Sequence, residues 1–168
     1  VLIPTETRMT ACISTQVGCS LTCAFCATGK LKRERNLSAG EIVDQVVAIN
    51  KLAEANYQKP LSNIVYMGMG EPLLNYANTL RSAERISAED GLGMSPRRIT
   101  VSTAGIAKMI RKLADDDARF NLALSLHAAN DKKRGMIMPI NEQNSIGELM
   151  DALRYYTRKT RKEVTFEY

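Results

Sequence analysis

The stretch GCSLTCAFCATG, residues 18–29, places three cysteines within eight positions: Cys19, Cys23 and Cys26. Closely spaced cysteines on a loop are typical of metal ligands in a reducing compartment, whereas secreted disulfide frameworks are denser and more dispersed. A zinc site commonly takes four ligands from two separated C-x2-C pairs, and this sequence has no second pair. Three thiolates can instead hold a 4Fe–4S cluster and leave one iron open to another ligand.

Outward from this loop, short apolar runs alternate with amphipathic stretches. Capping boxes mark the start of two helices, at Ser38 with Glu41 and at Ser145 with Glu148. Five strands separated by helices predict parallel β/α units in one domain of the α/β class. The sheet could curl into part of a barrel or remain open and doubly wound. The expected strands are residues 9–15, 63–69, 98–103, 120–127 and 163–168, and the expected helices are one from Ser38 and residues 78–90, 105–114 and 146–160.

Motifs with glycine and polar residues follow the first four strands. GMGEP (68–72), STAG (102–105) and SLH (125–127) close the second, third and fourth strands, as the cysteine loop closes the first. The carboxyl ends of parallel strands meet at one edge of a β/α sheet, so these motifs predict an active site there. Glycine lets the backbone approach a ligand closely, and a carboxylate such as Glu71 suits an ammonium group.

Some of these residues also have simpler interpretations. Ser102 and Ser125 could cap the ends of their strands, and His127 could be a hydrogen-bonded group behind the site. Met67 and Met69 alternate along the second strand, which predicts that both belong to the core.

The composition, with 45% hydrophobic and 24% charged residues, is that of a soluble globular protein. No segment has the ~20 apolar residues of a membrane-spanning helix, and no signal peptide is evident. We therefore expect a cytoplasmic protein without membrane association, or an organellar one if the source is eukaryotic.

The net charge of +5 permits a polyanionic partner. Three basic groups are expected to flank the active edge and to contact RNA phosphates, unless they are only solvated surface: Lys30, Lys32, Arg33 and Arg35; Arg97 and Arg98; and residues 132–134.

The spacing C-x3-C-x2-C, with Phe25 before the last cysteine, resembles that of the radical S-adenosylmethionine (SAM) enzymes. Five segments in order narrow the resemblance to the RlmN-type methyltransferases, which methylate carbon 2 of adenine in 23S rRNA and tRNA: ACISTQVGCSLTCAFCATG, VYMGMGEPLLN, SPRRITVSTAG, LALSLHAAN and MPIN. The resemblance implies a partial TIM-like barrel of about five parallel β/α units over residues 1–168, truncated at both ends. An amino-terminal RNA-binding domain and a carboxyl-terminal barrel segment are then expected outside this chain.

The resemblance also implies the cofactors and their ligands. A 4Fe–4S cluster binds SAM at its open iron, and an electron from a donor such as flavodoxin cleaves SAM to a 5′-deoxyadenosyl radical. The full-length protein is expected to be monomeric. The implied cluster ligands are Cys19, Cys23 and Cys26, and the implied SAM contacts are Phe25, which lies beside the adenine, Gly70, Glu71, Ser102, Ser125, Leu126 and His127.

Cys12 is implied to be catalytic. In the family, a cysteine near the carboxyl terminus receives a methyl group from one SAM molecule. A radical formed on that methyl group by a second SAM attacks the adenine carbon, and the counterpart of Cys12 resolves the RNA adduct through a disulfide. Taken alone, Cys12 could equally be a buried apolar cysteine. The chain has only four cysteines and no methyl-carrying one, so by itself it is expected to complete no methylation.

Two other functions remain open at this point. One is methylation of carbon 8 of the same class of adenine, as in the related antibiotic-resistance enzymes, although those tend to carry alanine where this chain has Pro72. The other is an RNA-binding module without catalysis, in which a zinc ion held by the three cysteines is completed by Cys12 or His127.

Overall fold

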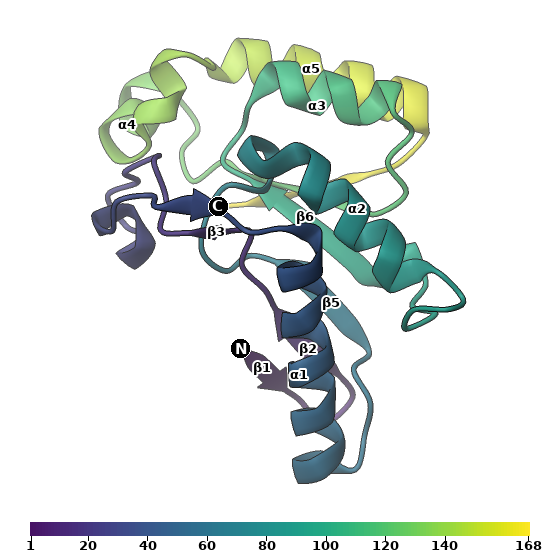
Figure 1. Cartoon of the computed structure of the whole chain (residues 1–168). Coiled ribbons are helices and arrows are strands. Elements are labelled where there is room, and N and C mark those ends of the chain that lie inside the picture. Colours follow the sequence, from purple (N-terminus) through teal and green to yellow (C-terminus); the bar gives the residue numbers. More distant parts are fainter.

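The computed structural model describes residues 1–168 and contains a twisted six-stranded sheet flanked by helices (Figure 1). The strand order is β1-β2-β5-β6-β7-β8, in which β1 is antiparallel to β2 and all other neighbours are parallel. A separate two-stranded ribbon pairs β3 with β4. The strands are β1 (Leu2–Pro4), β2 (Met9–Cys12), β3 (Gln16–Val17), β4 (Arg35–Asn36), β5 (Asn63–Tyr66), β6 (Ile99–Thr103), β7 (Asn121–Ser125) and β8 (Val164–Glu167).

The order of the parallel strands shows which α/β architecture is present. They follow one another across the sheet in chain order, without the reversal that defines a doubly wound sheet. Right-handed crossovers in one direction place every connecting helix on the same face, as in a β/α barrel. The predicted fold, a partial barrel with five parallel β/α units, is confirmed, and its open edges are β1 and β8.

Two helices begin at the predicted capping boxes, whereas the helices expected from residues 78 and 105 begin two residues earlier and two residues later. Ser38 and Ser145 each accept a hydrogen bond from the backbone of the glutamate three positions later, and both capping boxes are complete. None of the helices is both long and apolar enough to cross a membrane. The helices are α1 (Ala39–Tyr57), α2 (Tyr76–Ser87), α3 (Ala107–Asp115), α4 (Asp131–Ile137) and α5 (Ile146–Thr160).

Three features differ from the sequence prediction. Strand β1 and the short helix α4 were not expected, because three residues and seven residues carry too little periodicity to be recognised. The second parallel strand ends at Tyr66, before the two methionines that were expected in the core. Met67 and Met69 are 42% and 38% exposed, so their assignment to the core was wrong. The backbone leaves the sheet there to reach the glycine-containing segment 68–70.

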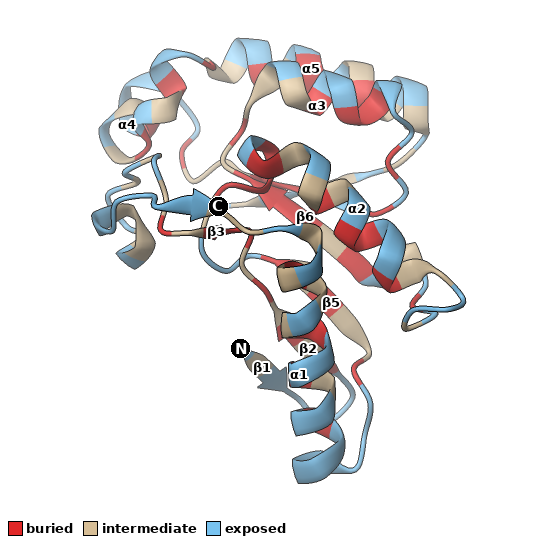
Figure 2. Ribbon diagram, viewed as in Figure 1, coloured by how far each residue is buried: buried red, intermediate tan, exposed pale blue.

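Buried residues recur along the strands of the sheet and along the helices that cover it (Figure 2). On the helix side, alternate strand residues such as Ala11, Ile64 and Val101 are fully buried in one hydrophobic core with α1, α2, α3 and α5. The alternation of strand side chains places their neighbours on the other face. That face carries residues such as Ser102 and Glu167, so the polar groups of the parallel strands are collected on one side of the sheet.

Candidate active site

The cysteine loop, residues 18–34, is closed at its neck by the β3–β4 ribbon. The amide of Glu34 donates to the carbonyl of Val17 at 2.8 Å just outside the ribbon. Farther out, the amide of Ala24 donates to the carbonyl of Ile137 at 2.9 Å, which fixes the loop against the end of α4. The loop is therefore closed by the strands that flank it and is held at its far side by a distant segment, the end of α4.

The predicted site residues meet at a hollow of about 240 Å³ at the carboxyl ends of the parallel strands, which we call the strand-end hollow. All three loop cysteines line it together with residues that follow β5, β6 and β7. The structure therefore brings together Cys19, Cys23, Phe25, Cys26, Gly70, Glu71, Ser102, Ser125 and His127.

Two predicted site residues do not line this hollow. Cys12 is the last residue of β2. Its neighbour Ala11 faces the core, so Cys12 lies on the other face of the sheet, which is the face of the site, but Cys12 does not line the hollow. The side chain of Leu126 packs against the hydrophobic core instead. Its backbone still contributes, because its amide donates to the carbonyl of Glu167 at 2.9 Å.

The three loop cysteines are free thiols in partly buried positions. Burial raises the pKa of the Cys23 thiol to about 11, reinforced by the neighbouring Cys19 and Cys26, and burial likewise raises the pKa of Cys19. Thiols crowded in this way are poor lone thiolates and become ligands when a cation displaces their protons. All three face one hollow. Three thiols around one hollow fit a cluster with one thiolate per iron.

Glu71 joins the ends of two strands from a buried position. Its carboxylate accepts three hydrogen bonds: from the amide of Leu73 at 3.0 Å, from the hydroxyl of Thr103 at 2.8 Å and from the amide of Ala104 at 2.8 Å. The residue is 3% exposed, and burial raises the pKa of its carboxyl group despite these donors. The carboxylate thus holds the segments after β5 and β6 together at the wall of the hollow.

Glu167 is a site residue that the sequence reasoning missed. Its carboxylate accepts hydrogen bonds from Ser125 at 2.7 Å and from Ser102 at 3.1 Å, and it lines the strand-end hollow. It therefore connects the ends of β6, β7 and β8. The rule that located the other motifs would also have found it, because Glu167 ends the last parallel strand.

Phe25 and His127 meet across the hollow. Their rings form an edge-to-face pair with centroids 4.6 Å apart. His127 adopts a left-handed φ of +56°, and its amide donates to the carbonyl of Glu167 at 3.0 Å. The single histidine is thus fixed by backbone and ring contacts between the cysteine loop and the end of β7.

The expectation that all three basic groups flank this site is partly wrong. Arg97 and Arg98 form the turn directly before β6 and lie at the amino-terminal edge of the sheet, opposite the hollow. Arg134 is fully buried and cannot contact RNA. Lys30, Lys32 and Arg33 of the cysteine loop are exposed and form no ion pair.

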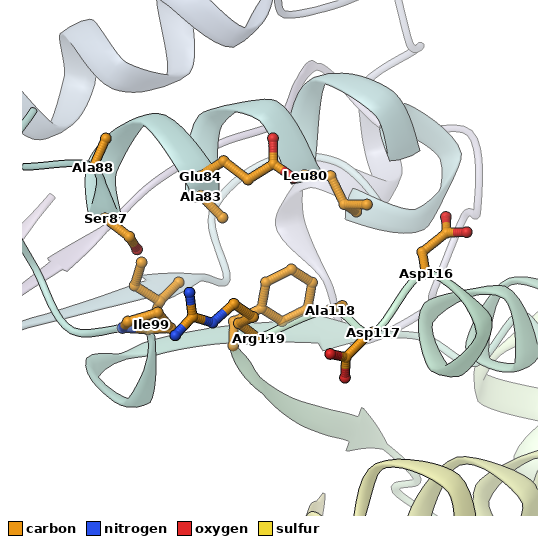
Figure 3. A pocket seen from close by; sticks show the side chains of 12 residues that line it. Leu80, Ala83, Glu84, Ser87, Ala88, Ile99, Asp116, Asp117, Ala118 and Arg119 are labelled. Atoms are coloured by element: carbon orange, nitrogen blue, oxygen red, sulfur yellow. The ribbon is translucent and has the colours of Figure 1, made fainter.

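A second, larger hollow of about 430 Å³ lies at the amino-terminal edge, between α2 and the start of β7 (Figure 3). Leu80, Ala83 and Ile99 give it an apolar lining, with Asp116 and Arg119 among its charged residues. It contains none of the predicted site residues. Ligand sites of β/α folds lie at the opposite edge, so size alone does not make this hollow the active site.

Comparisons with known proteins agree with this geometry. The model of the radical SAM superfamily matches residues 13–168. Relatives named "Probable dual-specificity RNA methyltransferase RlmN" are 58% identical in Flavobacterium johnsoniae and 61% identical in Cytophaga hutchinsonii, over this whole chain and 48% and 46% of their own lengths. The chain therefore spans about half the length of these curated relatives.

A solved structure shows the same fold. The crystal structure of a radical SAM methyltransferase from Sphaerobacter thermophilus superposes with a TM-score of 0.95 at 47% sequence identity. The match covers 99% of this chain and 49% of that chain. The three cysteines at the carboxyl edge, the parallel β/α units and the family match all lead to one assignment: the chain belongs to the radical SAM superfamily.

Proposed function

We propose that this chain is the catalytic core of a radical SAM methyltransferase that acts on carbon 2 of adenosine in 23S rRNA and tRNA. The observation that carries the proposal is the strand-end hollow, where three thiols face residues from the ends of β5, β6, β7 and β8. The substrate class is supported by the relatives named as RlmN dual-specificity RNA methyltransferases.

In this proposal Cys19, Cys23 and Cys26 hold a 4Fe–4S cluster, and SAM occupies the rest of the hollow. When bound, the cluster and SAM would supply a 5′-deoxyadenosyl radical, the oxidant needed to turn the cysteine-bound methyl group into a carbon radical, and a carbon radical can add to an adenine carbon that has no nucleophilic character. The protein orients the cofactor: Phe25 offers a partly exposed ring, while Ser102 and Ser125 offer hydroxyl groups already aligned by Glu167.

Cys12 is proposed to resolve the covalent RNA adduct through a disulfide. It is a free, partly buried thiol, and its place on the polar face of the sheet suits contact with a substrate held over the hollow. The partner cysteine, which would carry the methyl group, is not among the four cysteines of these 168 residues. The proposed reaction therefore needs that residue from elsewhere in the working enzyme.

The proposed partners follow from charge. Lys30, Lys32 and Arg33 are exposed beside the cluster ligand Cys19 and suit either the RNA backbone or an acidic electron donor of the flavodoxin class.

The test is anaerobic iron–sulfur reconstitution, with iron and sulfide counted and the EPR spectrum of the reduced holoprotein recorded with and without SAM. About four irons per chain and a spectrum that changes with SAM are expected. Mass analysis of the modified adenosine then separates methylation at carbon 2 from methylation at carbon 8. Bound zinc, or a cluster whose spectrum ignores SAM, would reject the proposal.

In the working enzyme, which supplies the methyl-carrying cysteine, replacing Cys12 by Ala is expected to leave iron content and the SAM-dependent spectrum unchanged while turnover stops with RNA attached to the protein. The reason is that the thiol acts only after the adduct has formed. Denaturing gels of the holoprotein with substrate RNA measure the adduct, and Cys23→Ala, which removes a cluster ligand, is the control that should form none. Release of methylated RNA by Cys12→Ala at the wild-type rate would contradict this role.

A further inference from the structure

Arg134 of α4 is fully buried, with 0% of its surface exposed. Its Nη2 donates to the carbonyls of Ala104 at 2.5 Å and Ser125 at 3.2 Å, and its Nε donates to the carbonyl of Leu126 at 3.2 Å. Its Nη1 donates to the side-chain oxygen of Asn141 at 2.9 Å. The guanidinium therefore lies directly behind the segments that end β6 and β7 at the strand-end hollow.

All four of these acceptors are neutral. Arg134 takes part in none of the ion pairs of the chain, all of which join exposed or half-exposed side chains. The carboxylate of Asp131, one turn earlier, accepts hydrogen bonds from Asn141 and from the amide of Ile146 rather than from Arg134. Burial lowers the pKa of Arg134 but does not discharge an arginine. The charge of Asp131 reaches Arg134 from an exposed position, across Asn141. A buried cation without a directly paired anion is costly, so a closer anion is expected in the working protein.

The cysteine loop is the element that could supply it. It rests on the end of α4 through the hydrogen bond from Ala24 to Ile137. Ala104 and Ser125, whose carbonyls accept from Arg134, line the same hollow as the three cysteines, so the guanidinium lies one residue behind the wall that faces the thiols. When the three cysteines bind a cation they become thiolates, and the site acquires the negative charge that Arg134 lacks.

We propose that Arg134 is the buried counter-charge of the three-cysteine site and that it raises the reduction potential of the cluster held there. This inference rests on the proposed function, because it requires a cluster. A positive charge favours the more negative, reduced state of the cluster over the oxidised state. Arginine rather than lysine suits the position because its planar fork reaches four acceptors on three segments at once, so Arg134 also fixes the wall behind the hollow.

The test is an EPR-monitored redox titration of the reconstituted holoprotein, in which dithionite supplies the one electron that reduces each cluster. Arg134→Gln is expected to change the ratio of oxidised to reduced cluster at a given potential at least tenfold, which corresponds to a potential about 59 mV lower. Lys133→Gln is the matched control. It removes the same charge from the neighbouring, exposed position of α4 and should change the ratio less than threefold.

A second variant keeps the arginine, in case its removal prevents folding. The exchange Asp131→Asn with Asn141→Asp moves a carboxylate onto the guanidinium without changing the net charge. In the native chain Asn141 donates a hydrogen bond to Asp131 at 2.9 Å. After the exchange the amide at position 131 can donate to the carboxylate at position 141, which also lies against the guanidinium. Neutralising Arg134 in this way should shift the ratio in the same direction as Arg134→Gln.

The outcomes separate this inference from the function on which it rests. A wild-type holoprotein that binds zinc, or no iron, overturns both. A SAM-responsive cluster whose potential is the same in the exchanged variant as in the wild type, or the same in Arg134→Gln as in Lys133→Gln, overturns only the role of Arg134.

Discussion

Replacing Glu71 by Gln is expected to lower the free energy of unfolding by about 2–3 kcal/mol, because at least one buried donor loses its acceptor. The carboxylate accepts from Leu73, Thr103 and Ala104, and an amide has only one oxygen to offer them. Its NH₂ group must then face an N–H or O–H group of the protein. Urea unfolding of both proteins measures the difference, and Glu84→Gln on the exposed side of α2 is the control with no expected change.

The same residue predicts a pH dependence. Because burial raises the pKa of Glu71 above its ordinary value of 4.5, the folded protein holds this proton more tightly than the unfolded chain does. Where the unfolded state binds fewer protons, stability falls as the pH rises. The contribution of Glu71 is therefore complete below about pH 4.5 and declines as the pH rises through the elevated pKa.

This decline can be isolated by comparison. Between pH 4 and pH 8, the contribution of Glu71 should make the free energy of unfolding of the wild type fall as the pH rises. The same contribution should be missing in Glu71→Gln, which has no proton to lose at this position. Parallel pH profiles for the two proteins would contradict the raised pKa. The result also bears on function. Glu71 is expected to contact the ammonium group of SAM, whereas in the structure its oxygens already accept hydrogen bonds from Leu73, Thr103 and Ala104.

Elements with strong local signals could be predicted from the sequence. Helix α5 was expected at residues 146–160 and is found there, because its capping box and its apolar stripe agree. The five parallel strands were recognised from their apolar runs, although all except β6 end earlier than expected. Strand β1 and helix α4 could not be recognised, since both are too short to show a periodicity of their own.

The site was predictable in position but not in detail. The rule that parallel strands end at one edge predicts that the cysteines, Ser102, Ser125 and His127 lie together, and in the structure they line one hollow. The burial of Arg134 could not be predicted, because in the sequence it stands beside two lysines and resembles solvated surface. A buried guanidinium is recognised only when its acceptors, which come from three separate segments, are seen together.

Gly18→Ala is expected to destabilise the protein by about 3 kcal/mol and to abolish cluster binding. Gly18 has a left-handed φ of +73°, and a Cβ there would overlap the carbonyl oxygen of Lys32 and lie 2.8 Å from its carbonyl carbon. These are backbone atoms of the opposite side of the loop neck and cannot rotate away. Alanine must therefore force the neck apart, and the three cysteines beyond it lose their common orientation.

Gly93→Ala separates backbone strain from this steric overlap. Gly93 also has a left-handed φ, +61°, but a Cβ there has no atom within 4 Å. It should cost only about 1 kcal/mol, the price of the backbone conformation, and leave the iron content unchanged. Urea unfolding and iron analysis of both variants after reconstitution decide the matter. Equal losses of stability in the two variants, or full iron content in Gly18→Ala, would show that the loop neck is not what orients the cysteines. If only Gly18→Ala loses iron, the close backbone contact at Gly18, a residue that does not bind the cluster itself, is what orients the three thiols.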